Sequence, residues 1–283
     1  MKGGITMSAI LAALSSDPNL LRCELHRLTQ QVVLRPEARA NALGVGSYAQ
    51  EEVLLRRLAP DRELTLDDLG PPHESEAVLF HAGRLPLGLS PEENTQPFRA
   101  RHWLFAHQGP LPDFEPLRAL LLSRVPEHLQ RQVRGPTDSE VLFALFLTRL
   151  RELGRTDDPR LEPTVAGRVL RDMVREVEAA LVQVGQVRTP PLNLVATNGT
   201  VLLATRCGES PLYYTRLEGS AECAHCGVDA ATPETHPEVA AHRRRRTVVV
   251  ASHVTRTQGW VELPQGTTLV MGADLQVQHL TAS

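Results

Sequence analysis

The chain lacks an excess of charge of either sign, and it lacks a long apolar run. Its formal net charge is -3 and its pI is near 6.4, so no general electrostatic attraction to nucleic acid or to an anionic membrane is expected. No apolar stretch approaches the roughly 20 residues that are needed to span a bilayer. We therefore expect neither nucleic acid nor a membrane among its partners.

Cysteine is also scarce, with four residues in a chain of 283. Small secreted domains use a high density of disulfides to compensate for a small core, and this composition excludes such a scaffold. The N-terminal stretch has no clear small-residue cleavage site of the kind that ends a signal peptide. These features predict a cytoplasmic protein that is long enough to bury a large core.

Lysine is almost absent, because Lys2 is the only one and every other cation is arginine. The high content of Ala, Arg, Leu and Pro indicates a GC-rich coding sequence, in which lysine codons are rare. The segment 2–4 can be encoded by a purine-rich stretch that contains a bacterial ribosome-binding sequence, shortly upstream of the Met7 codon. We therefore expect residues 1–7 to be leader plus initiator Met, which leaves Ser8 as the N-terminal residue. The alternative is an ordinary disordered tail.

Apolar periodicity divides the chain into strands, then helices, then strands. The expected strands are 9–14, 30–34, 43–48, 77–81, 103–107, 192–197, 200–205, 212–215, 247–251, 260–263 and 268–271, and the expected helices are 114–122, 138–153 and 163–184. The segment 53–58 fits either structure. Asn198-Gly199 between two strands is a strong hairpin signal. This order predicts two packed sheets with helices outside, in one domain.

Six short motifs stand in a fixed order at compatible spacing. They are Met7-Ser8-Ala9-Ile10-Leu11, Leu43-Gly44-Val45-Gly46, His81-Ala82-Gly83-Arg84-Leu85-Pro86-Leu87-Gly88, Glu93-Asn94-Thr95-Gln96-Pro97-Phe98, Phe105-Ala106-His107-Gln108-Gly109 and Gly135-Pro136-Thr137-Asp138-Ser139-Glu140. Together they resemble the class II glutamine amidotransferases of the N-terminal-nucleophile hydrolase superfamily, in the branch of small stand-alone members that includes γ-glutamyl amide hydrolases. Each motif alone is weak, but their joint order is strong.

The resemblance covers nearly the whole chain and implies a fold. It implies the α+β class and the four-layer αββα sandwich of N-terminal-nucleophile hydrolases, formed by a single domain over residues 8–283. A cysteine-containing insertion is expected at about 217–245.

The resemblance also implies catalytic positions, and several of them are changed. In the family an N-terminal Cys thiolate attacks the glutamine amide, and Ser8 takes that position as a weaker nucleophile. The oxyanion hole uses an Asn side chain and a Gly backbone N–H, which correspond to Gln108 and Gly109. Outside the family, Ser8 reads as a polar residue at a strand start and Gly109 as a turn.

The expected substrate-binding residues are Asp138, Arg84 and His107. Asp138 matches the acid that binds the substrate's amino group, while the arginine that binds the carboxylate falls at Gly83. Arg84 is adjacent, but neighbouring residues of a strand point to opposite faces, so a bulge is needed to aim it at the site. The simpler interpretations are a helix N-terminal residue for Asp138 and a core histidine for His107.

A second set of residues has the spacing of a metal site. Cys223 and Cys226 form a Cys-x-x-Cys knuckle, and His236 and His242 follow downstream. Thiolates and imidazoles in this pattern suit tetrahedral Zn²⁺ in a structural site. A pair of free cysteines in a loop explains the pattern equally well, and no other cofactor is required.

Three functions remain open from the sequence. The favoured one is an amidotransferase-fold protein that binds a small amide ligand or a protein partner without glutaminase activity, because Ser8, Gly83, Gln96 and Gln108 are all changed. The second is an active amidohydrolase that uses Ser8 as N-terminal nucleophile on a γ-glutamyl or other amide. The third is a zinc-stabilised interaction module on this fold. Whether the protein is an enzyme is therefore left undecided by the sequence.

Overall fold

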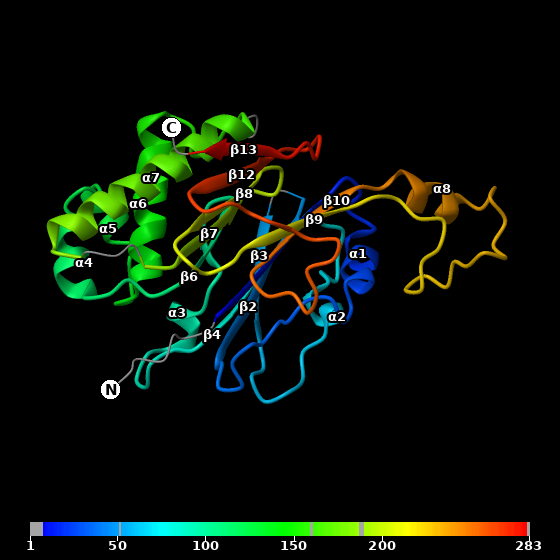
Figure 1. Cartoon of the computed structure of the whole chain (residues 1–283), viewed down its shortest axis with the longest axis horizontal. Coiled ribbons are helices and arrows are strands. Elements are labelled where there is room, and N and C mark those ends of the chain that lie inside the picture. Colours follow the sequence, from blue (N-terminus) through cyan, green and yellow to red (C-terminus); the bar gives the residue numbers. More distant parts are fainter. Residues whose placement is uncertain (1–7, 51, 159–160, 187–189, 282–283) are drawn as a thin grey trace.

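A computed structural model describes residues 8–50, 52–158, 161–186 and 190–281. The expected leader and initiator Met, at 1–7, lie outside the described residues. Two antiparallel sheets dominate the described chain (Figure 1). From edge to edge, the larger sheet contains β11 (Val261–Glu262), β9 (Tyr213–Leu217), β10 (Thr247–Ala251), β1 (Ala9–Ser15), β4 (Ala77–Gly83), β2 (Ala42–Ala49) and β3 (Glu52–Leu58). The smaller sheet contains β13 (Gln278–Thr281), β12 (Thr267–Met271), β8 (Leu202–Cys207), β7 (Leu192–Thr197), β6 (Trp103–Gln108) and β5 (Phe98–Ala100).

The two sheets pack face to face because their strands alternate apolar residues toward a shared core. Ile10 and Ala12 of β1 meet Leu104 and Ala106 of β6 in that core. The intervening residues of β1, such as Leu11, point to the outer face of the larger sheet. This alternation follows from the two-residue period of a strand.

Helices cover both outer faces of the sandwich. The described helices are α1 (Leu21–Arg27), α2 (Leu66–Leu69), α3 (Pro91–Asn94), α4 (Phe114–Leu122), α5 (Glu127–Gln130), α6 (Asp138–Glu152), α7 (Pro163–Gln183) and α8 (Pro237–Arg244). In Figure 1, α4 to α7 lie over the smaller sheet and α1 and α2 over the larger one. The expected four-layer αββα sandwich is thus confirmed. Among the described helices, none has the length and apolar character that crossing a membrane requires.

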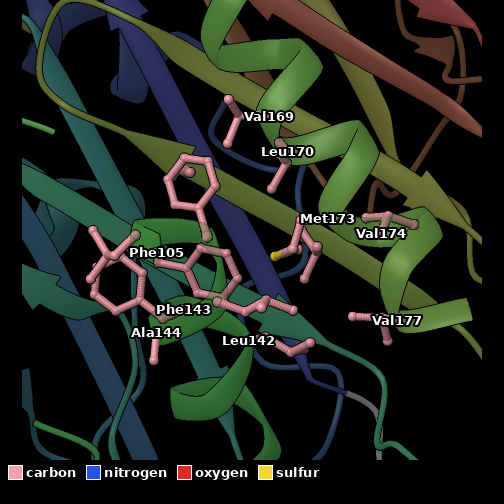
Figure 2. Packing of buried hydrophobic residues seen from close by; sticks show 14 of the residues in the cluster. Phe105, Leu142, Phe143, Ala144, Val169, Leu170, Met173, Val174 and Val177 are labelled. Carbon is pink, nitrogen blue, oxygen red and sulfur yellow. The ribbon is translucent and has the colours of Figure 1, made fainter. Parts of the chain in front are cut away.

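The helical layer owes its position to regular apolar stripes. On α7, Leu170, Met173, Val174 and Val177 recur at helical spacing and are buried against the smaller sheet (Figure 2). Phe105 of β6 lies between the layers, and its ring stacks at 5.2 Å on the ring of Phe143 in α6. The apolar outer face of β6 therefore ties the strand that leads to Gln108 to the helix that begins at Asp138.

The expected secondary structure is corrected in several places. The segment 30–34 was expected as a strand, but it is a turn with one isolated bridge from Val32 to Val254, and Gln30 has a left-handed φ of 68°. A left-handed residue interrupts the extended backbone that a strand needs. Several short elements were not predicted, because they are too short for periodicity to reveal; they are helices α1, α2, α3, α5 and α8 and strands β5 and β13.

Candidate active site

Ser8 lies directly before β1 and points between the two sheets. It is 8% exposed, and the alternation of β1 puts its side chain on the same face as Ile10. Ala9 of β1 pairs with Ala82 of β4, so the same register places Ser8 opposite Gly83. The expected nucleophile position and the position of the family's carboxylate-binding arginine are therefore neighbours.

Gln108 ends β6 and contacts Ser8 directly. Its carboxamide Nε2 donates a hydrogen bond to the backbone carbonyl of Ser8. Its Oε1 accepts a hydrogen bond of 3.0 Å from Nδ2 of Asn193, the residue directly opposite it on β7. Asn193 is fully buried and donates also to the carbonyl of Pro211 at 3.2 Å. The Gln108 side chain is thus held at both ends of its amide group.

Gly109 follows at a position that admits only glycine. Its φ is +107°, and a Cβ at this position would lie 1.9 Å from the carbonyl oxygen of Pro191. L-residues with a side chain avoid this backbone region, and the contact excludes one sterically as well. The close approach brings the start of β7 against the end of β6, next to Ser8.

His81 occupies the space beside Gly83 that an arginine side chain would need. A Cβ at Gly83 would lie 2.6 Å from Cε1 of the His81 ring. Burial, with a smaller contribution from nearby His107, lowers the pKa of His81 to about 3, so the imidazole is neutral at physiological pH. Both ring nitrogens of His81 and Oδ1 of Asn193 are buried without a hydrogen-bond partner among the described residues. Such atoms mark places where a polar ligand or water can bind.

Asp138 and His107 lie together, on the other side of β6. Asp138 Oδ2 accepts a hydrogen bond of 2.9 Å from the backbone N–H of Leu111, and Oδ1 accepts one of 2.8 Å from that of Ser139. The His107 ring follows Phe105 toward the helical layer, with Nδ1 3.0 Å from Ser139 Oγ and 3.9 Å from Asp138 Oδ1. Burial lowers the pKa of His107, and the Asp138 carboxylate opposes that shift. Asp138 thus bonds backbone N–H groups at the start of α6, and its binding of a substrate amino group stays a prediction. The His107 ring points away from the Ser8 face.

Arg84 is not brought to the Ser8 cluster. It follows the end of β4, and its guanidinium lies 3.6 Å from the carboxylate of Glu37, half-exposed. Strand alternation explains the difference, because Gly83 faces the sandwich interior and its neighbour leaves that face. The expectation that Arg84 binds a substrate carboxylate has no support in this geometry.

Two side chains of the cluster were missed by the sequence analysis as site residues. Asn193 is 85 positions from Gln108, and only the pairing of β6 with β7 brings their amides together. His81 belongs to a recognised motif, but its position over Gly83 depends on the absence of a side chain there.

A family model matches most of the chain. The model described as glutamine amidotransferases class-II matches residues 69–282. The chain belongs to this family. The matched part includes Gln108, Gly109 and Asp138, whereas Ser8 precedes it. The roles of all four residues stay predictions.

Known relatives agree with this assignment. A Saccharomyces cerevisiae protein described as probable glutamine amidotransferase DUG3 is 27% identical over 232 residues, which are 76% of this chain and 62% of the yeast protein. The chain thus spans less than two thirds of that relative's length. A glutamine aminotransferase class-II domain protein from Silicibacter pomeroyi is 21% identical, with a TM-score of 0.59 over 97% of this chain and 99% of that one. Glutamine phosphoribosylpyrophosphate amidotransferase from B. subtilis is 14% identical, with a TM-score of 0.51 over 96% of this chain and 49% of that one. The two structures show the shared fold.

The expected metal ligands form a cluster, with one change of membership. Cys223, Cys226 and His242 lie together, and the fourth member is Cys23 of α1. His236, which was expected as a ligand, is exposed at the start of α8 and is not among this group. Its position at the opposite end of α8 from His242 explains the correction.

Proposed function

We propose that this class II glutamine amidotransferase domain binds a small amide ligand at Ser8 and does not release ammonia from glutamine. The observation that carries the proposal is the position of the Gln108 carboxamide, which donates to the backbone carbonyl of Ser8. An oxyanion hole works because its donors already point at the place where charge develops. A donor that is bonded to another oxygen lacks this preorganisation, and loss of one such donor costs on the order of 3 kcal/mol, or roughly a hundredfold in turnover.

Recognition of glutamine itself is a second difficulty. The free carboxylate of glutamine needs a cation, and Gly83 supplies none. The His81 ring beside it is neutral, because burial holds its pKa far below physiological pH, and Arg84 pairs with Glu37. A ligand without a free carboxylate is therefore a better fit for this site.

The nucleophile is a third difficulty. A serine hydroxyl needs an adjacent base, and in N-terminal nucleophile enzymes the α-amino group is that base. This mechanism requires a chain that begins at Ser8. The thiolate that a cysteine offers near neutral pH is lacking here.

Binding of an amide is supported by the polar atoms around Ser8. The neutral His81 imidazole offers one donor and one acceptor, and Asn193 offers the acceptor Oδ1. An amide has a carbonyl acceptor and an N–H donor, so it can satisfy both. In place of a small ligand, a protein partner could insert an amide side chain at the same atoms. We also propose a cytoplasmic location.

The test measures ammonia and ligand binding separately. Intact mass spectrometry of protein from its native host shows whether the chain begins at Ser8, and a coupled assay then measures ammonia release from glutamine. The comparison variants are Ser8→Cys with Gln108→Asn, without and with Gly83→Arg, because a side chain at 83 must displace His81. We expect no release by the native protein. Clear glutaminase activity of the native protein would overturn the proposal.

A panel of small amides, screened by thermal shift, tests the binding part. Stabilisation by an amide without a free carboxylate is expected, and it should be weakened by His81→Phe, which removes the ring donor and acceptor. If no amide stabilises the protein, small-ligand binding is wrong and a protein partner is favoured.

The second candidate is an active amidohydrolase with Ser8 as nucleophile. One observation favours it: the position after Gln108 admits only glycine, and the resemblance assigns the backbone N–H of Gly109 to the oxyanion hole. The same panel decides, because turnover of a γ-glutamyl or N-acyl amide by the native protein, abolished by Ser8→Ala, would establish this function.

A further inference from the structure

Three cysteines and one histidine converge outside the Ser8 site. Cys23 comes from α1, Cys223 and Cys226 come from the segment between β9 and β10, and His242 comes from α8. Their ligand atoms all lie within 4.8 Å of one another, and Sγ of Cys23 is 3.3 Å from Sγ of Cys226. The four residues span over 200 positions, so the fold, not local sequence, assembles this group.

The orientation of His242 is already the one that a metal needs. The residue is 1% exposed, and its Nδ1 lies 2.7 Å from the backbone carbonyl of Glu238. A carbonyl only accepts, so Nδ1 carries the proton and Nε2 carries the lone pair. That Nε2 is buried and has no hydrogen-bond partner among the described residues. A histidine held by Nδ1–H on a carbonyl, with Nε2 free, is the usual arrangement of a metal-binding imidazole.

The Cys-x-x-Cys segment is folded as a tight knuckle. Cys223 and Val228 form an isolated bridge, in which the two backbone N–H to carbonyl distances are 2.7 and 3.0 Å. Gly227 closes the turn with a φ of +72°, where a residue without a side chain is favoured. This turn fixes two thiols on one side at a spacing that tetrahedral zinc sites use.

The segment that carries these ligands needs an additional constraint. Between β9 and β10 the chain extends away from the sandwich, with α8 at its base (Figure 1). The buried apolar cluster here is small, with Cys223, Val228 and Val239 of the segment against Leu20 and Cys23 of the α1 region. A core of this size does not stabilise a folded segment by itself, and small units usually add a metal or a disulfide.

We propose that Cys23, Cys223, Cys226 and His242 bind one Zn²⁺ as a structural site that fastens the 218–246 segment to helix α1. Three thiolates and one imidazole Nε2 fill all four tetrahedral positions with protein atoms, as in closed structural sites. The site leaves no position for substrate, and it is independent of the proposed ligand at Ser8. Zinc binding here releases thiol protons and contributes to folding of the segment.

Metal content is the first measurement. Full-length protein without an affinity tag is purified under reducing conditions, and elemental analysis is expected to find about one zinc per chain, as the four ligands imply. Cys23→Ser and His242→Ala should each lower the content severalfold. His236→Ala and Cys207→Ser are the matched controls and should keep it, because neither residue belongs to the cluster.

A spectroscopic measurement on the unaltered chain protects the test against variants that fail to fold. Metal-free protein is titrated with Co²⁺, and the expected spectrum has the visible bands of tetrahedral coordination and the near-ultraviolet charge-transfer bands of thiolate ligands. Added Zn²⁺ should remove them. A protein that binds neither metal, or whose mass without reductant is lower by two hydrogens because Cys23 and Cys226 form a disulfide, would overturn the proposal. Loss of zinc in His236→Ala with retention in Cys23→Ser would also overturn it.

Discussion

At Gln108, one methylene beyond asparagine carries the carboxamide to the Ser8 carbonyl. The fully buried Asn193 donates to Oε1, the other end of the Gln108 amide group. The arrangement satisfies polar groups that would otherwise be buried without partners, so it has a structural benefit apart from chemistry. The same bonds occupy the carboxamide that the resemblance assigns to the oxyanion hole.

Removing Asn193 tests the structural part. Asn193→Ala leaves the acceptors on Gln108 and Pro211 without their donor, and each such loss costs about 1–3 kcal/mol. We expect the free energy of unfolding in urea to fall by at least that amount. Asn19→Ala, on the surface, should change it by less than about 0.5 kcal/mol. Equal effects of the two substitutions would show that the Asn193 amide stabilises nothing.

His81 makes stability depend on pH with a defined sign. Its pKa is about 3 in the folded protein, below the roughly 6.5 of an unfolded chain. Between these pH values the unfolded state therefore binds more protons than the folded state. The contribution of His81 to the free energy of unfolding is fully present above pH 6.5 and is lost as the pH falls toward 3. The loss approaches about 1.4 kcal/mol for each pH unit.

The measurement compares urea unfolding at pH 7 and pH 5. His107 and His253 act in the same direction, because burial lowers the pKa of each. The contribution of His81 is therefore the difference between the native protein and His81→Gln, whose stability should fall less on acidification. Parallel pH profiles for the two proteins would contradict the assignment.

At the scale of elements, the ends of β6 and β7 and the start of α6 decide where the site forms. Gly109 permits β6 to turn beside Pro191, and Asp138 bonds the backbone of Leu111 in the turn that follows. The apolar contact of Phe105 with Phe143 aligns the strand and the helix. Apolar packing on the helical face of β6 thus fixes the strand, and Gln108 points from its opposite face toward Ser8.

Two glycine substitutions separate backbone strain from crowding. Gly109→Ala introduces a Cβ 1.9 Å from a carbonyl oxygen at a positive φ, whereas Gly154→Ala has a φ of +66° and open space around it. Both incur the strain of a left-handed alanine, about 1–2 kcal/mol. We expect Gly154→Ala to lose only that amount and Gly109→Ala to unfold or lose several kcal/mol more, measured by thermal melting. Similar melting temperatures would argue against the close approach at Pro191.

At the scale of the whole molecule, the 218–246 segment is joined to α1 by charge as well as by the proposed metal. Glu24, next to Cys23, forms an ion pair with Arg245, which follows α8, and both side chains are fully buried. Burial raises the pKa of Glu24, and Arg245 and Arg27 oppose that shift. A buried ion pair adds little net stability, because removing both charges from water is costly. Removal of one partner is nevertheless strongly destabilising, since it leaves the other charge buried and unpaired.

A double-mutant cycle on this pair measures the junction. Arg245→Met alone should lower the free energy of unfolding by about 3 kcal/mol, because Glu24 then keeps only the partly exposed Arg27. Arg245→Met with Glu24→Leu should recover most of the loss. Zinc content should stay unchanged in both, which distinguishes the ion pair from the metal site. Additive losses in urea unfolding would show that the two residues do not interact.

The order of the motifs was enough to indicate the family by resemblance. Strand alternation and helical stripes are local properties of the sequence, and they predicted two packed sheets with helices outside. The Cys-x-x-Cys knuckle was visible from its spacing, and Gly109 from the family motif that it completes. Site membership was not, since it depends on contacts between distant segments. Sequence analysis therefore chose His236 and Arg84, which lie near the right motifs along the chain.

Only the tertiary structure brought in Cys23, at 203 positions from Cys226, and Asn193, at 85 from Gln108. It also showed that Arg84 pairs with Glu37 and that the His81 ring lies beside Gly83. The alternation of a strand decides to which face a side chain points. The residue that it contacts there depends on the register of the sheet and on the position of the helices. Those are set by burial of the whole apolar surface, a sum over the molecule that no local pattern contains.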